Sequence, residues 1–263
     1  MSVPRPSSEG RWGGRVTSRE LPDARDELAA LAPQVREELA RIWWMQSATE
    51  ARVATSFAIV HEALVGLGAE APLIALAARA VDDEHRHAAL CAEMAKRLLG
   101  RDAPLPPDMD AARPSHPEAK SEQERRALFV IGQCALNETF ASGYLSTAHQ
   151  GARSPLARAA VNELLRDEID HSRLGWAYLS SMPADLRPAI SSWLLPLTVS
   201  NLREWRRSTA SHDTLLEEHG VPRAEAVRVA LDEVVTGVLV PGFAHVGLDT
   251  RPLERWAAHG MPT

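Results

Sequence analysis

The stretch AVDDEHRHAALC, residues 80–91, places two aspartates, a glutamate and two histidines inside an otherwise apolar segment. A second stretch, LLRDEIDHSRLG at residues 164–175, repeats this layout: an Asp-Glu pair is followed by a histidine three positions after the glutamate. Residues three apart on an α-helix project from the same face. Charged side chains on an apolar face cost free energy unless they are paired, hydrogen-bonded or bound to a metal. The two stretches therefore predict buried groups that combine carboxylates with imidazoles.

The composition is that of an ordinary globular protein, with 45% hydrophobic and 24% charged residues in 263. The net charge of −6 offers no electrostatic reason to expect a nucleic acid or an anionic membrane as a partner. No apolar run reaches the length of about 18 residues that a membrane-spanning helix needs. We therefore expect no nucleic-acid partner and no membrane partner.

Two further features bear on the compartment. Cys91 and Cys134 are the two cysteines, which is too few for a disulfide framework and fits a reducing environment. The first residues, MSVPRPSSEGRWGGRV, contain no apolar core of the kind a signal peptide has. Both features favour a cytoplasmic protein.

Helical spacing dominates the chain, and strand-like alternation is nearly absent. It predicts four long helices, joined by a turn at 66–72, an irregular proline-rich connection at 101–117 and a short link before Pro155; they cover 23–67 (interrupted at Pro33), 72–99, 118–149 and 155–182. Two further helices are predicted at 184–210 and 222–240. The fold class is all-α: a four-helix bundle with additional C-terminal helices. We expect a disordered tail at 1–20, the bundle at 21–182 and a helical extension packed on it at 183–263.

A metal site between four helices needs ligands from all four. Glu84 and His87 share one helix face, as do Glu168 and His171. Glu138, on the third helix, precedes Glu168 by 30 residues, which lets the chain run up, turn and return to a similar height.

The first helix offers two candidates. Glu50 precedes Glu84 by 34 residues and fits the same height argument. Glu62 precedes Glu84 by only 22 residues and would lie close to the helix end, so Glu50 is preferred and Glu62 stays as an alternative. Carboxylate oxygens with imidazole nitrogens suit iron or manganese better than copper.

The resulting pattern, Glu50 … Glu84-x-x-His87 … Glu138 … Glu168-x-x-His171, resembles the ferritin-like di-iron carboxylate superfamily over residues 35–181. It is closest in type to single-chain di-iron oxygenases. The segment DEHRH at 83–87 is similar to the Asp-Glu-x-Arg-His motif of bacterial multicomponent monooxygenases and ribonucleotide reductase small subunits.

The resemblance implies that these six residues bind two iron ions, with manganese an option in one or both positions. It further implies that Asp83 and Asp167 hold the histidine N–H groups across the bundle, and that Arg86 neutralises one buried carboxylate, Asp83 in first place.

The implied activity is oxidation of a small organic substrate with O2 by a non-haem di-iron oxygenase or oxidase. Its partners would be the substrate, O2 and an electron donor such as a reductase or a ferredoxin. Two alternatives remain: an iron-handling or peroxide-detoxifying protein of ferritin or rubrerythrin type, and a helical scaffold with a vestigial metal site. The oligomeric state is open, with a homodimer as one option.

Overall fold

The computed structural model describes residues 21–102, 116–209 and 214–259, and all regular structure in these ranges is helical. The expected tail at 1–20 and most of the expected connection at 101–117 lie outside the described residues. The α-helices are α1 (Arg25–Ala30), α2 (Pro33–Gly66), α3 (Ala71–Leu99), α4 (Glu122–Val130), α5 (Glu138–Gly151), α6 (Pro155–Ser181), α7 (Arg187–Thr209), α8 (Ala224–Val234), α9 (Val240–His245) and α10 (Arg251–Ala258). The short 3-10 helices are Ala184–Leu186 and Thr214–His219, and π-helical segments cover Ile131–Asn137 and Val235–Leu239.

Helix boundaries follow the local sequence signals. Pro33 and Pro155 are the first residues of α2 and α6, where the missing N–H costs nothing. The Ser154 hydroxyl accepts a hydrogen bond from the backbone N–H three residues on, which caps α6. Gly100, with φ of 66°, ends α3 in the left-handed conformation that glycine adopts without strain. These signals place the four long helices close to their predicted bounds.

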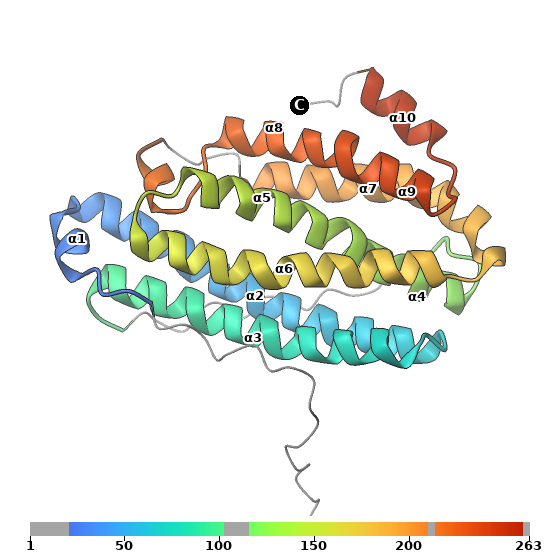
Figure 1. Ribbon diagram of the computed structural model, residues 1–263, viewed down its shortest axis with the longest axis horizontal. Helices are drawn as coiled ribbons and strands as arrows, with labels where there is room; N and C mark the ends of the chain where they lie inside the picture. The colour runs from blue at the N-terminus through green and yellow to red at the C-terminus, as the bar shows by residue number, and fades with distance from the viewer. Residues whose placement is uncertain (1–20, 103–115, 210–213, 260–263) are drawn as a thin grey trace, which may run out of the picture.

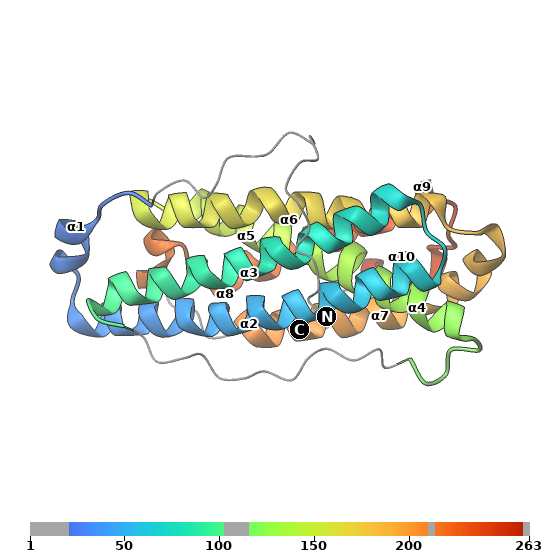
Figure 2. The ribbon, with the colours of Figure 1, turned by 90° about the horizontal axis from the view of Figure 1, so that it is seen from below.

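The helices form three layers (Figure 1). Helices α2 and α3 pack side by side along their length and make one outer layer (Figure 2). The middle layer contains α6 and the continuous helix α4–π–α5, and α6 packs against α3. Helices α7 and α8 make the other outer layer, where α8 packs on α5 and α7 packs on α4. The α2/α3 pair and the middle pair are the predicted four-helix bundle.

Two apolar clusters occupy different lengths of the bundle. One contains Phe57, Leu128 and Leu174 and continues into the α7–α8 layer. The other contains Leu39, Met94 and Val161. On α2, α3 and α6, the predicted metal ligands fall between the residues of these two clusters. On α5, Glu138 lies among residues of the first cluster, between Leu136 and Phe140. Apolar side chains therefore surround the ligand region along the bundle axis.

The predicted helices at 118–149 and 222–240 contain π-helical turns that the sequence analysis missed. The second prediction also ended too early, at residue 240, whereas the helix continues past Pro241 to His245. A proline lacks an N–H, and its ring clashes with the carbonyl four residues before it. The π turn Val235–Leu239 has i→i+5 bonding, so the chain passes Pro241 without ending the helix.

No helix in the described ranges combines the length and apolar character needed to cross a bilayer.

Candidate metal centre

The structure brings the six predicted ligands into one buried cluster from four helices. They are Glu50 of α2, Glu84 and His87 of α3, Glu138 of α5, and Glu168 and His171 of α6. None of the six is more than 5% exposed. Glu62, the alternative on α2, is exposed to solvent, and so is His85 of the DEHRH segment. Helix α2 therefore contributes Glu50 to the cluster, and the role of these residues as metal ligands remains a prediction.

Each imidazole Nδ1 lies between the same two carboxylates. His87 Nδ1 is 3.4 Å from Glu84 Oε2 and 3.5 Å from Glu168 Oε1. His171 Nδ1 is 3.0 Å from Glu84 Oε1 and 3.2 Å from Glu168 Oε2. The two rings are 6.0 Å apart between centroids, so the shared carboxylates fill the space between them.

Two overlapping groups of potential ligand atoms result, and within each group all atoms lie within 4.8 Å of one another. We call Glu50, His87 and the two shared glutamates the first half-site. The second half-site contains Glu138, His171 and the same two glutamates. The shared residues are Glu84 and Glu168, which belong to both groups. The arrangement therefore offers two adjacent positions, each surrounded by three carboxylates and one imidazole.

Each of the two aspartates contacts the histidine of the opposite helix. Asp167 Oδ2 on α6 is 3.2 Å from His87 Nε2, and Asp83 Oδ2 on α3 is 3.5 Å from His171 Nε2. Although burial opposes it, contacts with His87 lower the pKa of Asp167, and contacts with His171 and Arg86 lower the pKa of Asp83. Asp167 accepts the Nε2–H of His87, and Asp83 faces His171 Nε2 as an ion-pair partner, without a hydrogen bond. Both contacts leave Nδ1 directed at the carboxylates.

Two arginines neutralise the charges of these aspartates. Arg86, whose side chain is 41% exposed, donates to Asp83 Oδ1 at 2.8 Å and to Asp167 Oδ2 at 2.5 Å. Arg86 was expected to pair with Asp83, and the structure adds the contact with Asp167. It also adds Arg79, which pairs with Asp83 Oδ2 at 3.2 Å. The four ligand carboxylates are left without an arginine among the ion pairs of the described residues.

The two remaining glutamates are held by amide side chains that the sequence analysis missed. Gln46, one turn before Glu50, donates to Glu50 Oε1 at 2.5 Å. Gln133 donates to Glu138 Oε1 at 2.5 Å although it stands five residues before it, not four. The π-helical turn at Ile131–Asn137 explains the spacing, because i→i+5 bonding brings residues five apart onto one face. Gln46 stands four residues before Glu50, so ordinary helical spacing could have predicted its contact. The spacing of five between Gln133 and Glu138 gave no such signal.

Burial and mutual repulsion control protonation when no cation is present. Burial, together with the charges of Glu84 and Glu168, raises the pKa of Glu50 well above its ordinary value. Burial and Glu168 do the same for Glu138. Burial alone would lower the pKa of both histidines, but contacts with the surrounding carboxylates raise it well above the ordinary value. Burial opposes a low pKa at Glu168, but its contacts with both histidines lower that pKa.

The residues fit a pair of metal ions. Glu84 is fully buried, and neither of its carboxylate oxygens has a hydrogen-bond partner among the described residues; the same holds for His87 Nδ1. Such atoms cost free energy unless a cation binds them. Two donors about 2.1 Å from one divalent ion, at angles of 90–109°, are about 3.0–3.4 Å apart. The four Nδ1–carboxylate distances of 3.0–3.5 Å agree with this spacing.

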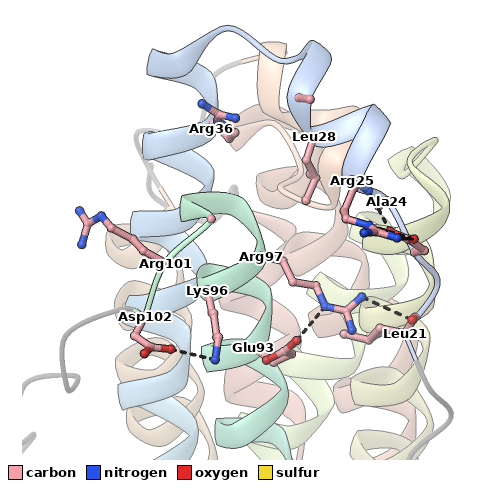
Figure 3. Close-up of a pocket in the computed structure, with 13 residues that line it drawn as sticks. Leu21, Ala24, Arg25, Leu28, Arg36, Glu93, Lys96, Arg97, Arg101 and Asp102 are labelled. Atoms are coloured by element: carbon pink, nitrogen blue, oxygen red, sulfur yellow. Dashed lines mark hydrogen bonds and ion pairs between the residues drawn. The ribbon is translucent and has the colours of Figure 1, made fainter.

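One hollow lies away from this cluster, at the end of the bundle where α1 meets α3 (Figure 3). It measures about 920 Å³ and is lined by charged side chains of both signs. Most of these neutralise one another locally, as in the pairs Lys96–Asp102 and Arg97–Glu93. Glu93 follows Glu84 by nine residues, or about 13 Å along the helix axis. The hollow therefore does not open on the ligand cluster.

A narrow cleft approaches the cluster more closely. It measures about 20 Å³, room for about one water molecule, and most of its lining is apolar, including Trp43, Val161 and Leu164. Gln46 also lines it and separates it from Glu50, to which it donates.

Comparisons with known proteins support the fold. No family model and no curated protein matches the chain. Among solved structures, it is similar to a protein from Synechococcus described as protein 19 with aldehyde deformylating oxidase activity. The TM-score is 0.59 at 18% sequence identity, and the match covers 86% of this chain and 97% of the other. At this identity the likeness concerns the fold alone: the chain has an all-helical, ferritin-like fold, as its sequence predicted.

Proposed function

We propose that this protein is a di-iron oxidase or oxygenase that uses O2 to oxidise a small organic substrate. The observation that carries the proposal is the pair of overlapping half-sites, in which buried Glu84 lacks hydrogen-bond partners among the described residues and faces both Nδ1 atoms. Four carboxylates balance the charge of two divalent cations. When bound, a ferrous pair supplies electrons and open coordination positions for O2.

The residues of the chain would contribute geometry, protonation control and exclusion of water. Asp167 and Asp83 fix the tautomer and orientation of His87 and His171. Gln46 and Gln133 each leave one oxygen of Glu50 and Glu138 available, because both donate to Oε1. The apolar clusters on either side keep water from the ligands.

The substrate would approach through the narrow cleft beside Gln46, since most of its walls are apolar and Gln46, which lines it, donates to Glu50 of the first half-site. A cleft of this size has to widen to admit anything larger than a water molecule. Aldehydes are the first class to test, because the solved structure that this chain resembles is described as having aldehyde deformylating oxidase activity.

The test begins with metal-free protein loaded anaerobically with Fe(II). We expect two ions per chain, and O2 uptake that increases when an aliphatic aldehyde and a chemical reductant are added together. Formate release would identify the deformylating reaction. At most one ion per chain would contradict the di-iron site. Rapid O2 uptake that needs no organic substrate and ends in ferric mineral would contradict an oxygenase and favour iron storage.

A matched pair of variants separates the site from general effects on α2. Glu50→Ala removes a buried ligand, whereas Glu62→Ala removes an exposed glutamate of the same helix. We expect the first variant to lose one ion and most O2 uptake, and the second to retain both.

A further inference from the structure

A hydrogen-bonded chain joins the outer α7 helix to one ligand of the proposed metal centre. Trp205 of α7 donates from Nε1 to Asn137 Oδ1 at 3.0 Å, although the two residues are 68 positions apart. Asn137 Nδ2 then donates to Glu138 Oε1 at 3.2 Å. The Trp205 ring contacts the Tyr144 ring of α5, with centroids 5.7 Å apart, which holds the indole against the middle layer.

The chemistry of the indole gives this chain a direction. An indole N–H donates and cannot accept, whereas an asparagine amide presents an acceptor on one side and a donor on the other. Because Trp205 binds the oxygen of Asn137, the NH2 group is directed at Glu138. Without the indole N–H, the amide is free to turn its oxygen toward the carboxylate, where two acceptors repel each other.

We infer that Trp205, acting through Asn137, is a positioning residue for Glu138, so that the α7–α8 layer controls the second half-site selectively. This inference rests on the proposed di-metal function. Glu138 receives donors from both Gln133 and Asn137 at the same oxygen, Oε1, and its other oxygen is thereby directed to the cluster. Glu50 of the first half-site is held by Gln46 from its own helix, so that contact does not depend on the outer layer.

The same helix offers a matched control. Trp193 of α7 donates from Nε1 to Glu124 Oε1 at 3.0 Å, and both indoles are partly buried. Glu124 accepts from the Lys120 backbone N–H and belongs to neither half-site. Trp193→Phe and Trp205→Phe therefore delete the same kind of hydrogen bond between the same layers, and they differ in whether the acceptor leads to a metal ligand.

The experiment is Co(II) titration of the metal-free protein, followed through the visible d–d bands, which report ligand geometry without turnover. Glu50→Gln and Glu138→Gln provide reference spectra for the loss of each half-site. We expect Trp205→Phe to weaken the second half-site on the order of 10-fold and to resemble Glu138→Gln at limiting metal. Asn137→Leu, which keeps the side-chain shape but makes neither bond, should weaken it at least as much. Trp193→Phe should stay within about twofold of the wild type.

The outcomes are distinct. Equal weakening of both half-sites in Trp205→Phe, or the same loss in Trp193→Phe, would show a general effect of the outer layer and overturn the inference. Unchanged binding in both Trp205→Phe and Asn137→Leu would overturn it as well. If Trp205→Phe does not fold, Asn137→Leu decides the question alone. Wild-type protein that binds fewer than two Co(II) ions would instead overturn the proposed function on which the inference rests.

Discussion

The two halves of the bundle present the same types of proposed ligand on different supporting residues. Helices α2 and α3 carry Glu50 and Glu84-x-x-His87 and form an outer layer, while α5 and α6 carry the matching set in the middle layer (Figure 1). In the first half, Gln46 reaches its glutamate over one ordinary α-helical turn. In the second half, a π turn, an extra amide and a tryptophan of α7 all converge on Glu138. The pattern of proposed ligands is thus duplicated, whereas the residues that position Glu50 and Glu138 differ between the halves.

The largest effect should come from the residues that both halves share. Glu84→Ala or Glu168→Ala removes a ligand atom from both half-sites, so we expect both ions to be lost. Glu50→Ala or Glu138→Ala removes an atom from one half-site and should leave one ion per chain. Metal analysis after gel filtration measures this directly. Retention of two ions in Glu84→Ala would show that the halves do not share ligands.

The metal-free protein should lose stability as the pH rises, and both halves should contribute. A raised pKa in the folded state means that the folded protein holds protons that the unfolded chain has released. For Glu50 and Glu138 this contribution is lost as the pH rises above about 4.5, and for the histidines above about 6.5. Each unit of pKa difference is worth about 1.4 kcal/mol. The pKa values of Glu168, Asp83 and Asp167 are lowered, so their contribution to stability is instead lost as the pH falls into the acid range.

We therefore expect the melting temperature of chelated protein to fall by several degrees between pH 6 and pH 8, whereas that of metal-loaded protein does not. Metal binding releases these protons and adds stability to the native state alone. Glu50→Gln and Glu138→Gln should each flatten the slope to a similar extent. A melting temperature of chelated protein that rises over this range would contradict the buried cluster.

Substitutions one turn after each histidine should affect the stability of the two halves differently. Gly175 follows His171, and a Cβ at Gly175 would lie 2.3 Å from the Ala135 backbone nitrogen in the π turn. Gly175→Ala should therefore cost about 3 kcal/mol of unfolding free energy, because backbone has to move. Cys91 holds the same position after His87 and is a buried free thiol, so Cys91→Ala should cost only about 1 kcal/mol. Urea denaturation compares them; equal losses would show that the close approach at Gly175 is relieved cheaply.

The effect of each aspartate should be confined to the histidine of the opposite helix. Asp167→Ala should weaken the half-site of His87, and Asp83→Ala that of His171, by about 10- to 100-fold in metal affinity. Asp82, exposed beside Asp83, is the control, and Asp82→Ala should bind metal as the wild type does. The half-site spectra of Co(II) measure this. Weakening of the half-site on the same helix as each aspartate would contradict the crossed arrangement.

Much of this molecule was predictable because the signals are local. Proline and glycine placed the ends of the long helices, and the spacing of three put Glu84 with His87 and Glu168 with His171 on shared faces. The intervals from Glu50 to Glu84 and from Glu138 to Glu168 predicted that each pair lies at a similar height in the bundle. The structure places Glu50 rather than Glu62 in the cluster. The all-α class follows from the same periodicity.

The π turns could not be predicted from these signals, because they depend on how neighbouring helices pack. The α6 backbone approaches the turn before Glu138 closely at Gly175, and an α-helical register would leave Gln133 on another face.

The sequence by itself determined which residues share a helix face, Glu84 with His87 and Glu168 with His171, because residues three apart project from the same side of a helix. Only the tertiary structure decided which groups support those ligands. Trp205 reaches Asn137 across 68 residues, and Asp167 reaches His87 across 80. Contacts of this kind depend on the rotation and height at which separate helices dock, and helical periodicity within one segment contains no information about either.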